Sequence, residues 1–594
     1  MDNIPIQYTG HLQADHSRHD GGLPLAAGVH SFQVLRANRE RPEMAEGIGW
    51  TYNHAPMLAY WNERFYLSYL SSPVYENGMP THTLIVSSQD GRHWEKPEVS
   101  FPAYPLPDSE DYAVAHQRMG FYVTRDGERL LALAFYGLSH DAKAFDMPND
   151  GRGIGRVVRE VYRDGSMGPI FFIRYNIHAG WGESNTSYAL YDKSEDSGFI
   201  AACEELLADK LMTLQWWEED RSTDGFYEVT GQKAFSWYTR DDGMTVGLWK
   251  WSKAALSADQ GQSWTEVADI PTFTMAGAKV WGARTSDGCY AIIYNPVADN
   301  GRRWPLAAAI GTDGIHFDRL LLVNGEVPPR RYSGFCKDYG LQYVRGIEEG
   351  NGVPPDRNLW ITYSMNKEDI WVSRIPIPIH ASEAGPVHDT FEQDRTGMPP
   401  SQWNVYEPAW TKVRVQQPGQ GTKRVLELRD ADPYDYAKAE RVLPALSYGS
   451  VSFTLSAMQS NRGWLEVDLT DAAGNRPFRL MLNQHGTLSV YRNREWKSVA
   501  VYNEEVEYRL EWIFNLEQRT ASLLVNHVPV VEQLEPAEPA GLIQRICFRT
   551  GPFREHPTPS SSTAEHMPDV PHAGIPTAEN VYLVSTLIAV QLSG

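Results

Sequence analysis

The chain has 594 residues, with 54 Lys or Arg and 75 Asp or Glu, so its formal net charge at pH 7 is −21. This excess of negative charge excludes a general attraction to a nucleic-acid backbone, and an acidic ligand must therefore meet a local cluster of Arg, Lys or His. The hydrophobic share of 42% and charged share of 22% exclude a largely disordered chain. The 19 Trp, 30 Tyr and 20 Phe favour a β-rich fold and are also common on sugar-binding surfaces.

The sequence has no apolar run of the ~18–20 residues that a membrane helix needs. Residues 1–5 show neither the basic region nor the apolar region of a signal peptide. We therefore expect a cytoplasmic protein, with a mature secreted form as the alternative. The four cysteines have no CxxC spacing, which predicts neither a disulfide framework nor a zinc ribbon.

Short alternating strands separated by tight turns fill residues 30–379. Asp126-Gly127, Asp242-Gly243 and Asp287-Gly288 each separate two apolar runs, which is a strong hairpin signal. Repeated four-stranded units indicate a β-propeller. At roughly 45–55 residues per blade we expect seven blades within residues 1–385.

Three turns share the pattern of an Asp box, Ser-x-Asp-x-Gly-x-x-Trp, in full or shortened form. They are Ser88–Trp94, Ser257–Trp264 and Thr312–Phe317. In such a turn Asp can accept hydrogen bonds from nearby amides, Gly supplies an unusual φ, and the aromatic residue packs into the blade. We interpret these turns as structural and not catalytic.

Two segments depart from the propeller pattern. Phe199–Trp217 has apolar residues at helical spacing, which predicts a helix over about residues 197–220, capped by Asp196 or Ser197 and inserted between blades. From Asp389 onward, alternating strands predict a β-sandwich of the jelly-roll or concanavalin-like type over residues 386–594. The predicted fold class is all-β, a seven-bladed β-propeller with a C-terminal β-sandwich.

A propeller binds its ligand over the central channel, where the inner strand of each blade begins. Counting back from each hairpin turn to that point places ionisable residues at one level in several blades. They are His54, His116, Lys233 and Lys279, with Tyr343 and Arg345 beside the corresponding strand of a later blade. This predicts a cationic cavity at the hub, with an ordinary polar channel lining as the alternative. His54 is the candidate general acid or base.

Arginines form a second set of candidates, since converging guanidinium groups would bind a sugar carboxylate in bidentate fashion. For each arginine alone, a surface salt bridge is the alternative. The candidate substrate-binding residues are Arg118, Arg174, Lys279, Arg284, Arg331 and Arg345.

A glycosidase would instead need two carboxyl groups, for which Glu218, Glu219 and Asp369 are candidates. For the first two, a solvated acidic helix end is the alternative. Metal-cluster, P-loop and GxSxG motifs are absent from the sequence, so no metal and no cofactor is predicted. A calcium ion in either domain is left open.

The stretches Trp50–Pro56, Phe65–Pro73, Tyr343–Ile347 and Tyr363–Trp371 resemble the L-rhamnose-α-1,4-D-glucuronate lyases, which are seven-bladed propellers. The Asp boxes also resemble those of sialidases and other BNR-repeat proteins. The resemblance to the lyases implies β-elimination, with a base that removes the C5 proton of a uronate and arginines that stabilise the developing charge. It implies catalytic roles for His54, His116 and His30, and it assigns the carboxylate to Arg118, Arg174, Arg284 and Arg331.

We therefore expect an exo-acting lyase that cleaves the glycosidic bond to a uronic acid in an oligosaccharide or polysaccharide. The alternatives are a propeller glycoside hydrolase of the rhamnosidase or sialidase type and a non-catalytic glycan-binding protein. Nucleic acid and membrane are not expected partners. A homo-oligomer formed through the sandwich domain is left open.

Overall fold

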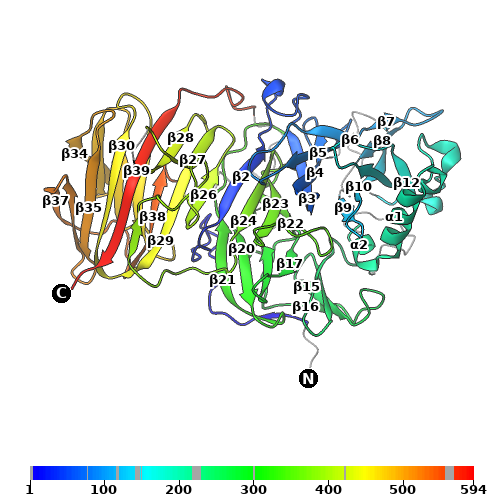
Figure 1. The fold of residues 1–594 in the computed structure, drawn as a ribbon, viewed down its shortest axis with the longest axis horizontal. Helices are drawn as coiled ribbons and strands as arrows, with labels where there is room; N and C mark the ends of the chain where they lie inside the picture. Colours follow the sequence, from blue (N-terminus) through cyan, green and yellow to red (C-terminus); the bar gives the residue numbers. More distant parts are fainter. Residues whose placement is uncertain are drawn as a thin grey trace.

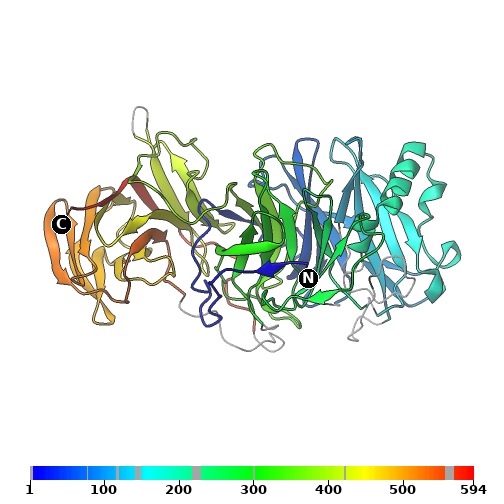
Figure 2. The same ribbon diagram turned by 90° about the horizontal axis from the view of Figure 1, so that it is seen from below.

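The computed structural model describes residues 5–76, 78–115, 120–140, 148, 150–216, 229, 231–298, 302–419, 423–554 and 568–593. A propeller and a second β domain lie side by side along the long axis of the molecule (Figures 1 and 2). The predicted all-β class and the order of the two domains are confirmed. None of the helices in the described part of the chain has the length and apolar character needed to cross a membrane.

The first three blades follow one another along the chain. The first contains β3 (Tyr52–Trp61), β4 (Arg64–Ser72), β5 (His82–Ser88) and β6 (Glu98–Phe101). In the second, β8 (Tyr112–Ala115) and β9 (Gly120–Val123) both pair with β10 (Leu130–Ser139), followed by β11 (Gly155–Val161) and β12 (Phe171–Tyr175), with β7 (Tyr104–Pro105) beside β8. The third contains β13 (Ser236–Thr239), β14 (Thr245–Trp249), β15 (Lys253–Ser257) and β16 (Ala268–Asp269).

The N-terminal segment adds a strand to each of the last two blades. The fourth blade contains β17 (Trp281–Arg284), β18 (Tyr290–Tyr294), β20 (Leu306–Gly311) and β21 (His316–Asn324), with β1 (Gln7–Tyr8) parallel to β21. The fifth contains β22 (Tyr339–Gly346), β23 (Leu359–Met365) and β24 (Asp369–Ile375), and β2 (His30–Leu35) is its outer strand. A short strand, β19 (Arg302–Arg303), pairs with β22.

The described residues therefore form five blade sheets and not the seven predicted. The predicted number was too high because long connections enter the blades. One runs from β12 to β13 and carries two α-helices among its described residues, and another joins β21 to β22. Dividing the chain by roughly 45–55 residues per blade counts these connections as additional blades.

The predicted helical insertion is present as α1 (Ser197–Ala208) and α2 (Lys210–Leu214). The side chain of Asp196 caps α1 by accepting hydrogen bonds from the amides of Gly198 at 2.8 Å and Phe199 at 3.1 Å. Phe199, Cys203 and Leu206 are buried on one side of α1 in a core shared with strands of the second and third blades. The end of the predicted helix, residues 217–220, lies outside the described residues.

The second domain is a β-sandwich of two sheets. One contains β26 (Trp403–Glu407), β29 (Lys438–Leu446), β38 (Ile543–Arg549), β31 (Leu465–Thr470), β32 (Phe478–Leu482), β33 (Thr487–Arg492) and β34 (Glu495–Val501). The other contains β27 (Thr411–Gln416), β28 (Val425–Asp430), β39 (Asn580–Gln591), β30 (Tyr448–Ala457), β35 (Tyr508–Asn515), β36 (Thr520–Val525) and β37 (Val528–Leu534), with β25 (Val387–Asp389) beside β39. The predicted division at residues 385 and 386 falls between β24 and β25.

Strand β2 joins the two domains, since it runs antiparallel to β24 and parallel to β26. The last blade therefore continues into one sheet of the sandwich.

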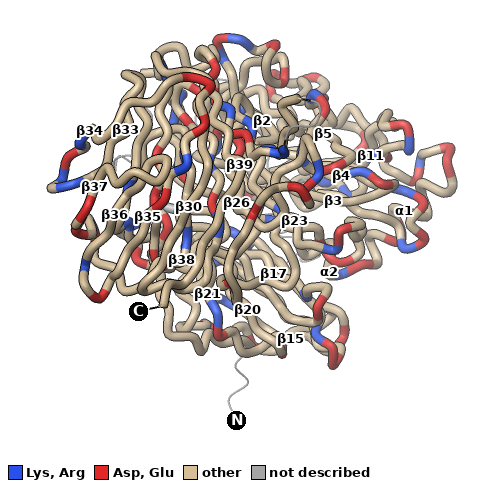
Figure 3. The backbone as a smooth tube through the Cα atoms, turned by 60° about the vertical axis from the view of Figure 1, so that its left-hand side comes forward, with Lys and Arg blue, Asp and Glu red and all other residues tan. Residues whose placement is uncertain are grey.

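The Asp boxes occupy the turn between the third and fourth strands in three blades. Asp90, Asp259 and Asp313 each accept a backbone hydrogen bond, from His93, Ser263 and His316 respectively, at 2.7–2.8 Å. Acidic and basic residues are interspersed over both domains (Figure 3).

Candidate functional site

At one end of each blade, side chains from two parts of the chain lie at the same level: the start of the inner strand and the turn between the second and third strands. Adjacent strands are antiparallel, so the start of the inner strand and the turn between the second and third strands lie at the same end. The inner strands provide His54, Tyr343 and, just before β17, Lys279. The turns after the second strands provide Glu76, Lys250, Arg303 and Lys367.

Tyr343 is the centre of this group, which we call the hub cluster: His54, Lys250, Lys279, Arg303 and Tyr343. The Nζ of Lys250 donates a hydrogen bond of 2.8 Å to the phenol oxygen. The Nζ of Lys279 lies 4.9 Å from the centre of the Tyr343 ring, and the Cζ of Arg303 lies 5.1 Å from it. The ring of His54 packs against the same phenol with a centre-to-centre distance of 4.4 Å.

A local irregularity in β22 directs Tyr343. Its φ is +53°, and the pairing of β22 with β23 shifts register between Gln342 and Arg345. A bulge of this kind re-aims a side chain, and a positive φ is uncommon for a residue other than glycine. The arrangement persists because the surrounding side chains hold the tyrosine in place.

The hub cluster is cationic and buried. The exposed fractions of Lys279, Lys250 and Arg303 are 1%, 5% and 7%. Nearby carboxylates are shared, since Asp338 lies 2.9 Å from the Nζ of Lys367 and 3.9 Å from Arg303, and Glu76 lies 3.2 Å from Lys367. Lys250, Lys279, Arg303 and Lys367 thus lie on one rim together with the carboxylates of Asp338 and Glu76.

A second, fully buried ionic network supports the strand that carries His54. The side chain of Asn53 donates a hydrogen bond of 2.8 Å to the carbonyl of Glu368. The Nζ of Lys337 lies 3.3 Å from a carboxylate oxygen of Glu368, and burial lowers the pKa of Lys337 to about 8. His54 itself is held by Ser364, whose hydroxyl lies 2.8 Å from the ring Nδ1.

The predicted site residues separate into two groups in the structure. His54 and Lys279 meet in the hub cluster. Arg345 is buried beneath it and donates hydrogen bonds to the carbonyls of Val280 at 2.8 Å and Phe235 at 2.9 Å, so its guanidinium joins three blades. The predicted residues His116, Arg118, Glu218 and Glu219 lie outside the described residues.

Five further predicted residues lie outside the hub cluster: Arg331, Asp369, Arg284, Arg174 and His30. Arg331 forms buried ion pairs with Glu368 and Asp369, the latter also a predicted carboxylate. Arg284 is at the far end of β17, where it pairs with Asp241 at 2.6 Å. Arg174 is on β12, an outer strand. His30 lies at the junction of the two domains, where burial lowers its pKa to about 3.

Five residues in or beside the hub cluster were not predicted from the sequence: Lys250, Arg303, Glu76, Asp338 and Lys367. Only the starts of the inner strands were used to locate the hub. The turn after each second strand lies at the same level, and in four blades it carries an ionisable residue. That signal is present in the sequence, since the same hairpin turns that locate the inner strands also locate these positions.

Comparisons with known proteins agree with this architecture. Residues 4–233 match a family model described as "BT_1020-like, N-terminal beta propeller", and residues 403–565 match one described as "Sialidase-like, CBM domain". A solved structure titled "Sialidase" is 41% identical, with a TM-score of 0.92. The propeller is thus similar in fold to that of the structure with this title. That match covers 99% of this chain and 54% of the other, so the chain spans about half the length of its relative.

More distant structures include the sialidase of Trypanosoma rangeli, which is 12% identical with a TM-score of 0.37 and matches over 95% of this chain and 96% of that one. None of the curated proteins matches the chain. The match to the 41% identical structure runs through the propeller and the sandwich together, and the two family models fall one in each domain.

Proposed function

We propose that this sialidase-like protein is a glycoside hydrolase that releases a sugar acid from the end of a glycan. The observation that carries the proposal is the convergence of Lys250, Lys279 and Arg303 on Tyr343. These buried cations would hold the carboxylate of the sugar, as an acidic protein requires. The relative titled "Sialidase" supports the hydrolase over the lyase predicted from the sequence.

Tyr343 is the nucleophile in this proposal. Most glycosidases use a carboxylate, whereas sialidases use a tyrosine. A phenol suits a substrate whose own carboxylate would repel a second carboxylate near the reacting carbon. Lys250, which donates to the phenol oxygen, would stabilise negative charge on that atom before the attack.

The reaction then has two displacements. Tyr343 first releases its phenolic proton to water, and Lys250 stabilises the phenolate. The phenolate oxygen then bonds to the anomeric carbon as the bond to the leaving oxygen breaks, and a carboxylic acid gives its proton to that leaving oxygen. Asp338 and Glu76, which share Lys367, are the candidate acids on the same rim. Water next gives one proton back to the carboxylate and attacks the anomeric carbon, which displaces the Tyr343 phenolate and yields the free sugar acid. His54 acts as a positioning residue through its contact with the Tyr343 ring.

Product analysis in oxygen-18 water tests the proposal. The protein is incubated with sialyl-capped and uronate-capped oligosaccharides, and the released sugars are analysed by mass spectrometry. A hydrolase places one heavy oxygen in the released sugar acid, and the Tyr343→Phe variant should lose this activity. The matched control is Tyr69→Phe, because Tyr69 is buried and its hydroxyl makes no hydrogen bond with the described residues. An unsaturated sugar without the label would show a lyase, and binding without turnover would show a glycan-binding protein.

A further inference from the structure

A pocket of about 380 Å³ lies on the fourth blade, under the N-terminal segment. Strand β1 fastens this segment, since the amide of Gln7 donates to the carbonyl of Ile315 at 2.8 Å and that of Thr9 to Phe317 at 2.7 Å. The amide of Tyr8 donates to the hydroxyl of Thr272 at 3.0 Å across the pocket wall. The pocket is therefore formed by two fixed walls, and its size is within the range of small-ligand sites.

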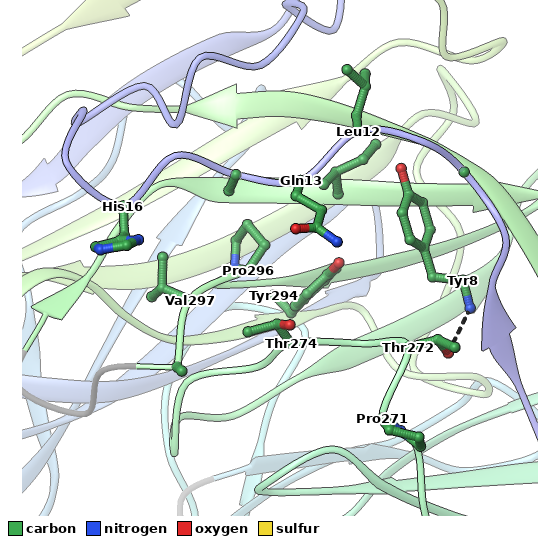
Figure 4. Close-up of a pocket in the computed structure, with 14 residues that line it drawn as sticks. Tyr8, Leu12, Gln13, His16, Pro271, Thr272, Thr274, Tyr294, Pro296 and Val297 are labelled. Carbon is green, nitrogen blue, oxygen red and sulfur yellow. Dashed lines mark hydrogen bonds between the residues drawn. The ribbon is translucent and has the colours of Figure 1, made fainter.

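The pocket has an apolar floor and a polar rim. Tyr294 and Val297 are buried at the floor. Gln13 and Thr274 are on the rim, and Figure 4 shows Gln13 directed from the N-terminal segment toward Tyr294 and Thr274. Among the described residues that line the pocket, none is a lysine, arginine, aspartate or glutamate, and His16 is the one histidine.

The tyrosines that line the pocket pack against an aromatic cluster centred on Phe273. The ring of Phe273 packs edge-to-face against Tyr294 at 5.6 Å and against Phe317 at 5.7 Å, and Tyr8 packs against Phe273 at 6.0 Å. Such a cluster fixes the tyrosine rings before a ligand arrives, which lowers the entropic cost of binding.

From these features we infer that the pocket binds a neutral sugar residue. A pyranose presents an apolar face of C–H groups and a rim of hydroxyls. The first matches apolar lining residues such as Leu12, Pro271 and Pro296, and the second matches the Gln13 and Thr274 side chains. A sugar acid would instead favour the hub cluster, whose cations do not line this pocket. The inference goes beyond the proposed hydrolase, because binding here requires no turnover.

Saturation-transfer NMR on the full chain tests the inference with methyl β-D-galactopyranoside, methyl α-L-rhamnopyranoside and lactose as probes. At least one should receive saturation from the wild-type protein. The Thr274→Trp variant, which fills the pocket, should weaken binding of that probe at least tenfold, and Gln13→Ala should weaken it about threefold to tenfold. Thr396→Trp and Gln518→Ala change residues of the sandwich domain and should leave binding unchanged.

Two results would overturn the inference. One is that none of the three probes binds. The other is that binding persists at full strength in Thr274→Trp. The Tyr343→Phe variant separates this inference from the proposed function, because it should keep the sugar binding while it loses hydrolysis. Loss of probe binding in Tyr343→Phe would place the neutral sugar at the hub cluster and would also overturn the inference.

Discussion

The Nζ of Lys250 and the phenol oxygen of Tyr343 lie 2.8 Å apart, although the two residues are 93 positions apart in the chain and belong to different blades. Lys250 follows the second strand of the third blade, and Tyr343 is on the inner strand of the fifth. A propeller brings such positions together because every blade directs the same end toward one rim of the channel.

Replacing Lys250 by Met should lower kcat/KM for an acidic glycan by about a hundredfold to a thousandfold, because a charged donor at the reacting oxygen is lost. The loss should appear mainly in kcat if Lys250 acts on Tyr343 in the transition state. Steady-state kinetics check this. Lys253→Met is the matched control, since Lys253 pairs with Asp269 at the surface, and its kinetic constants should be unchanged.

The Asp259→Ala variant should lose stability and keep its activity. Asp259 accepts hydrogen bonds from the amide of Ser263 at 2.8 Å and from the hydroxyls of Ser263 and Ser257, all within the turn between β15 and β16. Loss of these bonds should lower the free energy of unfolding by about 1–2 kcal/mol. Denaturant unfolding measures the loss of stability, and steady-state kinetics on the same preparation measure the activity. A large fall in kcat/KM would contradict the interpretation of the Asp box as purely structural.

Most of the fold could be predicted from the sequence, because its signals are local. Asp-Gly turns between alternating runs predict the hairpins, and the helical spacing of Phe199, Cys203 and Leu206 predicts α1. The number of blades could not be predicted, since it depends on which connections belong to a sheet. Lys279 was predicted by counting back from a turn. Lys250 was not predicted, because only the starts of the inner strands were counted, although the turn after the second strand also locates it. Its distance to Tyr343 is set only when three blades close around the channel.

Replacing Glu368 by Gln should destabilise the protein by about 3–5 kcal/mol, because it leaves Lys337 and Arg331 as buried cations with one carboxylate fewer. Urea unfolding measures the change. Glu532→Gln, an exposed carboxylate on β37, is the control and should change the free energy of unfolding by less than about 0.5 kcal/mol. Equal stability of the two variants would contradict a supporting role for the network behind β3.

Stability should also depend on pH through Asp430. Burial raises the pKa of Asp430 from its ordinary value of 3.8 to about 8. The folded state then keeps a proton that the unfolded state has released, so the free energy of unfolding should fall as the pH rises between these two values.

The Asp430→Asn variant should remove that fall, since an amide is neutral at every pH and its oxygen can still accept from the hydroxyl of Thr550, which lies 2.7 Å from the Asp430 carboxyl. The variant should gain stability relative to the wild type as the pH approaches 8. Thermal unfolding over this range measures the gain, with the exposed Asp318→Asn as the control. The same pH slope in wild type and Asp430→Asn would contradict the assignment.

The most direct test of the central claim is the affinity of the hub cluster for a sugar carboxylate. Calorimetric titration compares sialic acid and glucuronic acid with their uncharged methyl esters, on the wild type and on Arg303→Ala. We predict that at least one acid binds the wild type tenfold or more tightly than its ester, and that Arg303→Ala removes this preference. Equal affinities of acid and ester for the wild type would contradict the claim.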